Sequence, residues 1–185
     1  MAKRTGTKVI TNEIRASYAH VFTPSALEGN EPKYSMAVLI PKTDTETIEA
    51  IEAAIAQATE EGKGKWNGKV PPNLKTPLRD GDEERPDDEA YQGHYFFNAT
   101  SKSKPGVVKK GAAGLMEITE DSDEFYSGAY AKVSVNFYAY NANGNRGIAA
   151  GLNNVLKTKD GDRLAGAASA MSDFADEFED DDLLD

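Results

Sequence analysis

The 185-residue sequence contains no cysteine and only two histidines, His20 and His94. Without cysteine the chain has no disulfide framework, no thiolate metal site and no cysteine nucleophile. The His-Glu-x-x-His spacing of a zinc site is missing, so no metal or other cofactor is expected. No stretch approaches the roughly 20 apolar residues that span a bilayer, and no apolar run follows the basic start, as a secretory signal requires. These absences predict a soluble intracellular protein.

Lysine and arginine are missing from Asp173–Asp185, a segment that holds eight acidic residues. Two further acidic runs, Asp80–Glu89 and Glu120–Glu124, add to the formal net charge of −10. Outside these three runs the chain is net basic. Because the placement of charge decides what a surface can bind, the acidic total does not exclude a nucleic-acid partner.

The most regular pattern in the chain is the alternation across Gly128–Tyr140, which predicts a strand with one face on a core. The core face consists of Ala131, Val133, Val135, Phe137 and Ala139. The opposite face carries tyrosines, a lysine and small polar residues, namely Tyr130, Lys132, Ser134, Asn136, Tyr138 and Tyr140. Tyrosine rings can stack on bases and a lysine can bind phosphate, so this face suits a single nucleic-acid strand. Tyrosine is also a good strand former, which leaves an ordinary sheet face as the alternative.

The remaining patterns predict four more strands and one helix. The strands cover residues 8–21, 33–40, 93–102 and 148–157. The helix follows the second strand, begins near Thr43 or Asp44 and ends at Gly62. Such an element order fits a mainly β, five-stranded OB-fold-like Greek-key barrel with one added α-helix over residues 1–165. From Gly166 the chain is too polar to bury a core, so residues 166–185 are expected to form a disordered acidic tail.

Aromatic and basic residues recur together in two other segments. Trp66 lies among lysines that include Lys65, and it either stacks on bases or folds back onto the core. Tyr95 and Phe97 share one face of the strand 93–102 and form a possible second platform. The predicted DNA-binding set is therefore Tyr130, Lys132, Tyr138, Tyr140, Arg146, Lys102, Lys104, Tyr95, Phe97, Trp66 and Lys65.

Two alternatives assign the function to the acidic runs. A metal-dependent nuclease would have to use Asp80, Asp82, Asp87 and Asp88. This run is not an EF-hand loop, and catalytic carboxylates usually need rigid support, so the chain is not expected to be an enzyme. A second alternative is an interaction protein or DNA mimic whose acidic runs are the active surface.

The sequence also resembles a family of bacteriophage single-stranded DNA-binding proteins with an OB-fold. The resemblance is carried by the segments 17–22, 33–35, 39–42, 77–82, 138–140 and 147–155, which read SYAHVF, KYS, LIPK, PLRDGD, YAY and GIAAGLNNV. It implies sequence-tolerant binding that protects and organises single strands in phage DNA replication, recombination or repair, in the cytoplasm of the infected bacterial host. RNA stays open as a ligand, because stacking is indifferent to the sugar.

The end of the chain resembles the acidic tails of bacterial and phage single-strand binding proteins. That resemblance implies a segment that recruits phage or host replication and recombination proteins and competes with DNA for the binding groove. The implied partner-binding residues are Phe174, Phe178, Asp180, Asp181, Asp182, Leu183 and Leu184. The bacterial tails close on Pro-Phe, whereas here Leu183 and Leu184 precede a final Asp185, so phage-encoded partners are expected.

Overall fold

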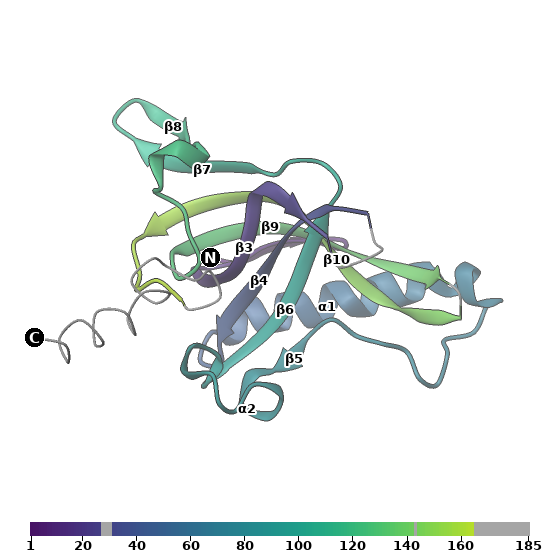
Figure 1. Ribbon diagram of the computed structural model, residues 1–185. Coiled ribbons are helices and arrows are strands. Elements are labelled where there is room, and N and C mark those ends of the chain that lie inside the picture. Colours follow the sequence, from purple (N-terminus) through teal and green to yellow (C-terminus); the bar gives the residue numbers. More distant parts are fainter. Residues whose placement is uncertain (27–30, 143, 165–185) are drawn as a thin grey trace, which may run out of the picture.

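The computed structural model describes residues 1–26, 31–142 and 144–164. Five long strands form its body, namely β3 (Ile14–Ser25), β4 (Lys33–Pro41), β6 (His94–Ser101), β9 (Tyr130–Ala142) and β10 (Asn145–Lys159). Neighbours pair in the order β9-β3-β4-β6-β10, and β10 pairs with β9 again, which closes the barrel (Figure 1). All pairings in the barrel are antiparallel except that of β10 with β6. The predicted mainly β OB-fold class is confirmed.

The alternation of β9 is confirmed in the structure. Its five predicted core residues are all buried, and each residue between them is at least partly exposed. Phe137 packs beside Phe97 of β6, with ring centroids 5.6 Å apart. The strand therefore separates a dry interior from an outer face that solvent can reach.

Several short strands pair with strands of the barrel. They are β1 (Lys3–Thr5), β2 (Lys8–Ile10), β5 (Arg79–Asp80), β7 (Gly106–Gly111) and β8 (Gly114–Glu117). Strands β1 and β2 are added next to β9, β5 next to β6, and β7 and β8 next to β10. The predicted strand over residues 8–21 is divided between β2 and β3. The hairpin of β7 and β8, which the sequence analysis did not identify, pairs with β10 and projects from the barrel (Figure 1).

Helix α1 (Thr45–Glu61) lies where the sequence predicts a helix, between the second and third barrel strands. Asp44 caps it, because its side chain accepts a hydrogen bond from the amide of Thr47 at 3.2 Å. Ile48, Ile51 and Ala58 on its buried side pack into the main core. The 3-10 helix η1 (Gly62–Trp66) follows directly. No helix among the described residues is long and apolar enough to cross a membrane.

Part of the outer barrel surface is covered by the segment between β5 and β6. This segment contains α2 (Gly81–Glu84) and the 3-10 helix η2 (Glu89–Tyr91), and the 3-10 helix η3 (Glu120–Ser122) precedes β9. Tyr91 packs edge-on against Phe96 at 5.0 Å and joins a small cluster with Ala37 and Leu39. The N-terminal half of β6 is thus buried on both faces, which leaves only its C-terminal half open.

Candidate nucleic-acid interface

The outer face of β10 forms the floor of a shallow trough. Ile148, Ala150 and Leu152 point into the core, so the residues between them face outward. Two of these outward positions, Ala149 and Gly151, are small. Because these side chains are short, the outer surface over β10 is recessed relative to the longer side chains of β9 and β6. A flat ligand could therefore approach the β10 backbone closely.

Side chains of β9 and β6 form the two walls of this trough. Tyr138 of β9 lies opposite Ala149 and is 46% exposed. Its ring leans towards Gly151, where an added Cβ would lie 3.7 Å from Cε1 of the tyrosine. On the other side, Asn98 and Thr100 of β6 are exposed or partly exposed. The trough therefore offers one accessible aromatic ring and several polar groups.

One end of the trough is closed by the backbone around Lys75. The amide of Lys75 donates to the carbonyl of Arg146 at 3.1 Å, and its carbonyl accepts from the amide of Ile148 at 2.8 Å. This crossing requires glycine at position 147, because a Cβ there would lie 2.5 Å from the Lys75 carbonyl oxygen. The crossing carries the Lys75 side chain to the end of the trough.

Three hollows border the outer face of β9 and β10. The first, called the Lys75 hollow, is lined by Lys75, Thr76, Pro77, Arg79, Asn98, Thr100, Tyr140 and Ile148–Ala150. The second, called the Lys104 hollow, is lined by Lys8, Ser101, Ser103, Lys104, Asn136 and Leu152–Asn154. The third, called the Lys132 hollow, is lined by Lys109, Lys110, Lys132 and Leu156–Asp160.

The three hollows follow one another along β9. Tyr140, Asn136 and Lys132 line successive hollows and are separated by four residues each. At about 3.4 Å per residue, neighbouring hollows lie roughly 14 Å apart along the strand. A single extended strand could therefore pass all three.

The charge of this surface is strongly positive. Among its described lining residues, the only acidic one is Asp160, which pairs with Lys157. Lys8, Lys104, Lys110 and Lys132 form no ion pair with any described residue. Unpaired ammonium groups along one path are the arrangement that binds a row of phosphates.

An acidic residue near the Lys132 hollow is held in its charged form. Glu13 accepts a hydrogen bond from the hydroxyl of Thr158 at 2.7 Å and pairs with Lys159 at 3.2 Å. The Thr158 bond, together with Lys159 and the charge of Lys132, holds the pKa of the Glu13 carboxyl below its usual value. Lys159 is thus partly neutralised, whereas Lys132 remains available.

Tyr130 lies on the predicted outer face but its ring is already occupied. The guanidinium of Arg15 lies 5.5 Å from the ring centroid, and the ammonium of Lys159 lies 4.6 Å from it. Gly161 approaches so closely that an added Cβ would lie 2.8 Å from the ring. These cation–π contacts make Tyr130 a weaker candidate for base stacking than Tyr138.

The aromatic pair predicted on β6 is not a second platform. Phe97 is fully buried and packs inside the barrel. Tyr95 shares this inward face, packs against the core and has the ammonium of Lys42 5.0 Å from its ring centroid. Phe96 on the other face is covered by Tyr91. The expectation that Phe97 stacks on bases is therefore wrong, because its ring lies inside the barrel. Tyr95 is partly exposed, and its stacking on a base stays a prediction.

Trp66 folds back onto the core, the alternative considered from the sequence. Its side chain is 3% exposed, and the indole nitrogen donates to the carbonyl of Tyr140 at 3.1 Å. The ammonium of neighbouring Lys65 donates to the carbonyl of Ala139 at 2.9 Å. Both side chains thus fasten η1 to β9, and the structure does not place Trp66 where a base could stack on it.

Two other predicted cations lie at the periphery. Arg146 is exposed near the tip of the β9–β10 hairpin, opposite Asn141. Lys102 is exposed after β6 and pairs loosely with Glu31 at 3.9 Å. Neither lines one of the hollows. The predicted tail residues, Phe174 through Leu184, lie outside the described residues.

Two of the four carboxylates proposed for a nuclease, Asp80 and Asp82, are bound by one lysine. The ammonium of Lys42 lies 2.7 Å from both Asp80 and Asp82. Asp82 also accepts from the amide of Gly93 at 3.0 Å. The hydrogen bond from Lys42 is the main reason that the pKa of each aspartate lies below its usual value. The described residues contain no group of three or more acidic or histidine side chains suited to a metal.

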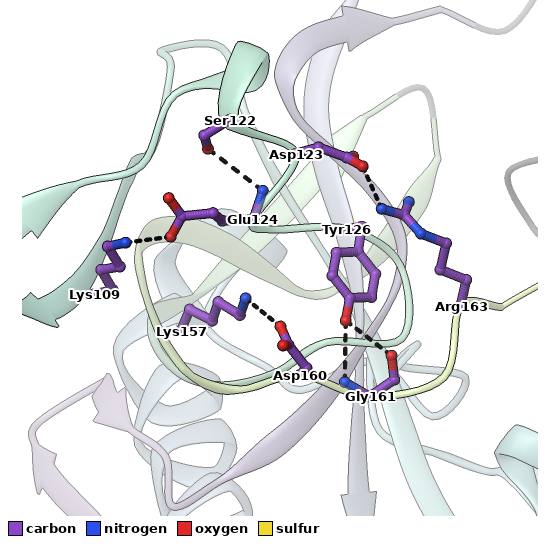
Figure 2. Close-up of polar contacts among 9 residues, drawn as sticks. All are labelled: Lys109, Ser122, Asp123, Glu124, Tyr126, Lys157, Asp160, Gly161 and Arg163. Carbon is purple, nitrogen blue, oxygen red and sulfur yellow. Dashed lines mark hydrogen bonds and ion pairs between the residues drawn. The ribbon is translucent and has the colours of Figure 1, made fainter.

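Figure 2 shows how the chain beyond β10 is held against the body next to the Lys132 hollow. Tyr126 bonds both backbone polar groups of Gly161, and Arg163 pairs with Asp123. Arg163 also lies over the Tyr126 ring, 4.2 Å from its centroid. The last described residue, Leu164, donates from its amide to the carbonyl of Ser127 at 3.0 Å.

Sequence reasoning missed much of the cationic surface. The residues not foreseen as contacts are Lys8, Lys75, Arg79, Asn98, Thr100, Lys109, Lys110, Asn153, Lys157 and Lys159. They come from separate segments that only the barrel brings together. One signal was present over residues 147–152, where Gly147, Ala149 and Gly151 recur with period two and make one face of the strand consist of small residues only.

The closed barrel with one parallel pairing and an exposed aromatic and basic face defines an OB-fold protein of the class that accommodates single strands. Residues 7–184 match the family model described as the single-stranded DNA-binding protein of Enterobacter phage Enc34. The chain belongs to this family of phage single-stranded DNA-binding proteins, and the resemblance stated from the sequence is confirmed.

Individual relatives agree with this assignment. Protein p50 of Acyrthosiphon pisum secondary endosymbiont phage 1 is 32% identical over 183 residues, covering 94% of this chain and 93% of the relative. The single-stranded DNA-binding protein of bacteriophage Enc34, solved in complex with single-stranded DNA, superposes with a TM-score of 0.75 at 26% identity, covering 89% of this chain and 97% of that one. The protein gp2.5 of bacteriophage T7 shares the fold, with a TM-score of 0.59 at 19% identity and 96% and 95% coverage.

Proposed function

We propose that this protein binds single-stranded DNA, without strong sequence preference, along the outer face of β9 and β10. The observation that carries the proposal is the trough over Ala149 and Gly151, with the exposed Tyr138 ring at its wall and, along its course, lysines that form no ion pair with a described residue. Membership of the phage family and the DNA complex of the Enc34 relative support it.

Within the trough, the Tyr138 ring stacks on a base, and the polar side chains of β6 form hydrogen bonds with the edge of that base. Stacking suits every base, because each has a π-face, so binding of this kind is tolerant of sequence. Tyr140, partly exposed beside the Lys75 hollow, is a second stacking position. Lys104 and Lys132 neutralise phosphates on either side of Asn136.

Membership of the phage family supports a biological setting for this binding. Coating of single strands protects and organises them during phage DNA replication, recombination or repair in the cytoplasm of the infected host. We assign no catalytic role. The acidic segment 173–185 recruits replication and recombination proteins and competes with DNA for the lysines. The hydrogen bonds between Tyr126 and Gly161 support this competition, because they hold the chain at Gly161 next to Asp160, which lines the Lys132 hollow.

The direct test is a fluorescence titration with labelled single-stranded and duplex oligonucleotides over a series of salt concentrations. We expect tight binding of the single strand that weakens steeply with salt, and much weaker binding of the duplex. The same titration is repeated on protein lacking residues 173–185. Binding by the truncated protein alone would show that the acidic segment blocks the DNA-binding surface, whereas no binding by either form would show that no such surface exists. Failure of both forms to bind either oligonucleotide would reject the proposal and turn attention to the acidic surfaces.

A further inference from the structure

The β7–β8 hairpin carries the most exposed apolar side chains in the body of the barrel sheet. Leu115 is 67% exposed and Met116 is 52% exposed, and all four residues of β8 are exposed. The hairpin is not a separate module, because β7 pairs with β10 from Gly106 to Lys109. It is therefore a continuation of the same sheet that forms the trough (Figure 1).

The register shows which hairpin residues share the outer face. Val107 is buried beside Val155, so Val108 and Lys110 point to the opposite, outer side. Leu115 lies directly opposite Lys110 and shares its face. Met116 lies opposite Lys109, on the other face, and folds across Gly111.

The same surface continues without a break onto β10 and β9. Leu156 is the neighbour of Val108 on one side and of Lys132 on the other. Lys110, Lys132 and Leu156 all line the Lys132 hollow. The row across the strands is Glu117, Val108, Leu156 and Lys132, and beside it Lys110 lies opposite Leu115. Apolar and cationic side chains thus share this face with one acidic residue, and Lys110 and Lys132 have no ionic partner among the described residues.

A row of this kind matches the chemistry of an unpaired nucleic-acid strand. Each nucleotide presents an apolar base face and a charged phosphate, which a leucine and a lysine can cover side by side. We propose that the β7–β8 hairpin is a second contact surface for the bound single strand, with Leu115 packed on a base and Lys110 and Lys132 on adjacent phosphates. This inference rests on the proposed function, and it extends the DNA path beyond the trough.

The path has a predictable length. From Tyr140 to Lys132 the strand β9 covers about 27 Å, and crossing from β9 through β10 and β7 to β8 adds roughly 14 Å. A short oligonucleotide can fill the trough without reaching Leu115, whereas a longer one covers both surfaces. The contribution of the hairpin should therefore depend on the length of the strand.

The test compares the wild type with Leu115→Ser, Lys110→Ala and Tyr138→Ala, and uses Val70→Ser as the matched control. Val70 is also an exposed apolar residue, at 41%, but lines none of the three hollows. Dissociation constants are measured by fluorescence anisotropy on strands of about 6 and about 14 nucleotides, within the range of site sizes known for OB-folds. Thermal unfolding checks that each variant remains folded.

We expect Leu115→Ser to weaken binding of the longer strand about fivefold and to leave the shorter strand unaffected. Lys110→Ala should also weaken only the longer strand, and Val70→Ser should weaken neither. Abasic nucleotides at one end of the longer strand should abolish the difference between wild type and Leu115→Ser. The end at which this happens, 5′ or 3′, gives the polarity of the bound strand.

Equal affinities of the wild type and Leu115→Ser for the longer strand would overturn the proposal. A loss seen only on strands that hold several copies would also overturn it, since Leu115 would then contact a neighbouring protein. Tyr138→Ala reports on the trough separately, because it should weaken both strands. If the wild type binds neither strand, with or without residues 173–185, the proposed function fails and the hairpin assignment fails with it.

Discussion

The phenol of Tyr126 donates a hydrogen bond to the carbonyl of Gly161 at 2.9 Å and accepts one from the amide of the same residue at 3.2 Å (Figure 2). One side chain therefore satisfies both backbone groups of a residue beyond the last strand. Arg15 adds a third bond, from its guanidinium to the carbonyl of Asp162 at 2.7 Å. Together they hold residues 161 and 162 against the barrel.

Replacing Tyr126 with phenylalanine removes both bonds but keeps the ring. Since a hydrogen bond contributes about 0.5–1.5 kcal/mol, we expect the free energy of unfolding to fall by about 1–2 kcal/mol in urea denaturation. Hydrogen exchange should speed up at residues 160–164. Tyr34→Phe is the matched control, because the Tyr34 hydroxyl bonds no described residue. A Tyr126→Phe protein as stable as this control would show that the two hydrogen bonds between Tyr126 and Gly161 do not contribute to the free energy of unfolding.

Tyr138→Ala should weaken binding of single-stranded DNA by about 5- to 100-fold, the loss expected for one stacked base. Anisotropy titration at fixed salt measures it. Tyr18→Ala provides the comparison, because Tyr18 is similarly exposed at 37% but lies beside Arg85, away from the trough. An equal loss in the two variants would mean that the effect does not arise from stacking in the trough.

The salt dependence should identify individual phosphate contacts. Lys104→Ala is expected to lower the slope of log K against log salt by about 0.7, because one fewer counterion is released from a single strand. Lys63→Ala is the control, since Lys63 pairs with Glu60 at the end of α1 and lines no hollow. If the plots of log K against log salt had equal slopes for the wild type and Lys104→Ala, Lys104 would not contact a phosphate.

The pair of aspartates around Lys42 predicts a pH dependence of stability. The folded-state pKa values of Asp80 and Asp82 lie below their unfolded value of about 4, chiefly because of hydrogen bonds from Lys42. The ionised aspartates contribute to the free energy of unfolding above about pH 4, and this contribution is lost as the pH falls through their lower, folded-state pKa values. The stability difference between the wild type and Lys42→Met should therefore shrink below pH 4.

Urea denaturation of both proteins between about pH 3 and 6 measures this difference. Lys63→Met serves as the control, because it removes an exposed i,i+3 pair that is expected to matter little at any pH. If the difference between wild type and Lys42→Met stayed constant down to pH 3, the lysine would not be the cause of the low aspartate pKa values.

Deletion of residues 173–185 should raise the affinity for single-stranded DNA at low salt, since eight negative charges would no longer compete for the lysines. The gain should disappear at high salt, where exposed charges are screened. The control is a full-length protein with the same segment reordered at random. Unchanged affinity of the truncated protein at low salt would contradict competition by the tail.

The sequence by itself determined the five long strands and the helix α1. Burial on one face imposes a period of two on β9 and a helical period on α1, and both periods are visible in Val133, Val135, Ile48 and Ile51. It also determined the outward direction of Tyr138 and Lys132, because in a strand the side opposite the core is the side that solvent reaches. The sequence did not predict the short strands β5, β7 and β8, because runs of two to six residues are too short to show a clear hydrophobic period.

Only the tertiary structure decided which aromatic and basic side chains share a surface. Phe97 and Trp66 are aromatic like Tyr138, but closure of the barrel and the packing of η1 bury their rings. Lys75, Lys104 and Lys132 are far apart in the chain, and strand pairing brings them to one face. Pairing partners distant in sequence are set by the packing of the whole barrel, and no local pattern encodes them.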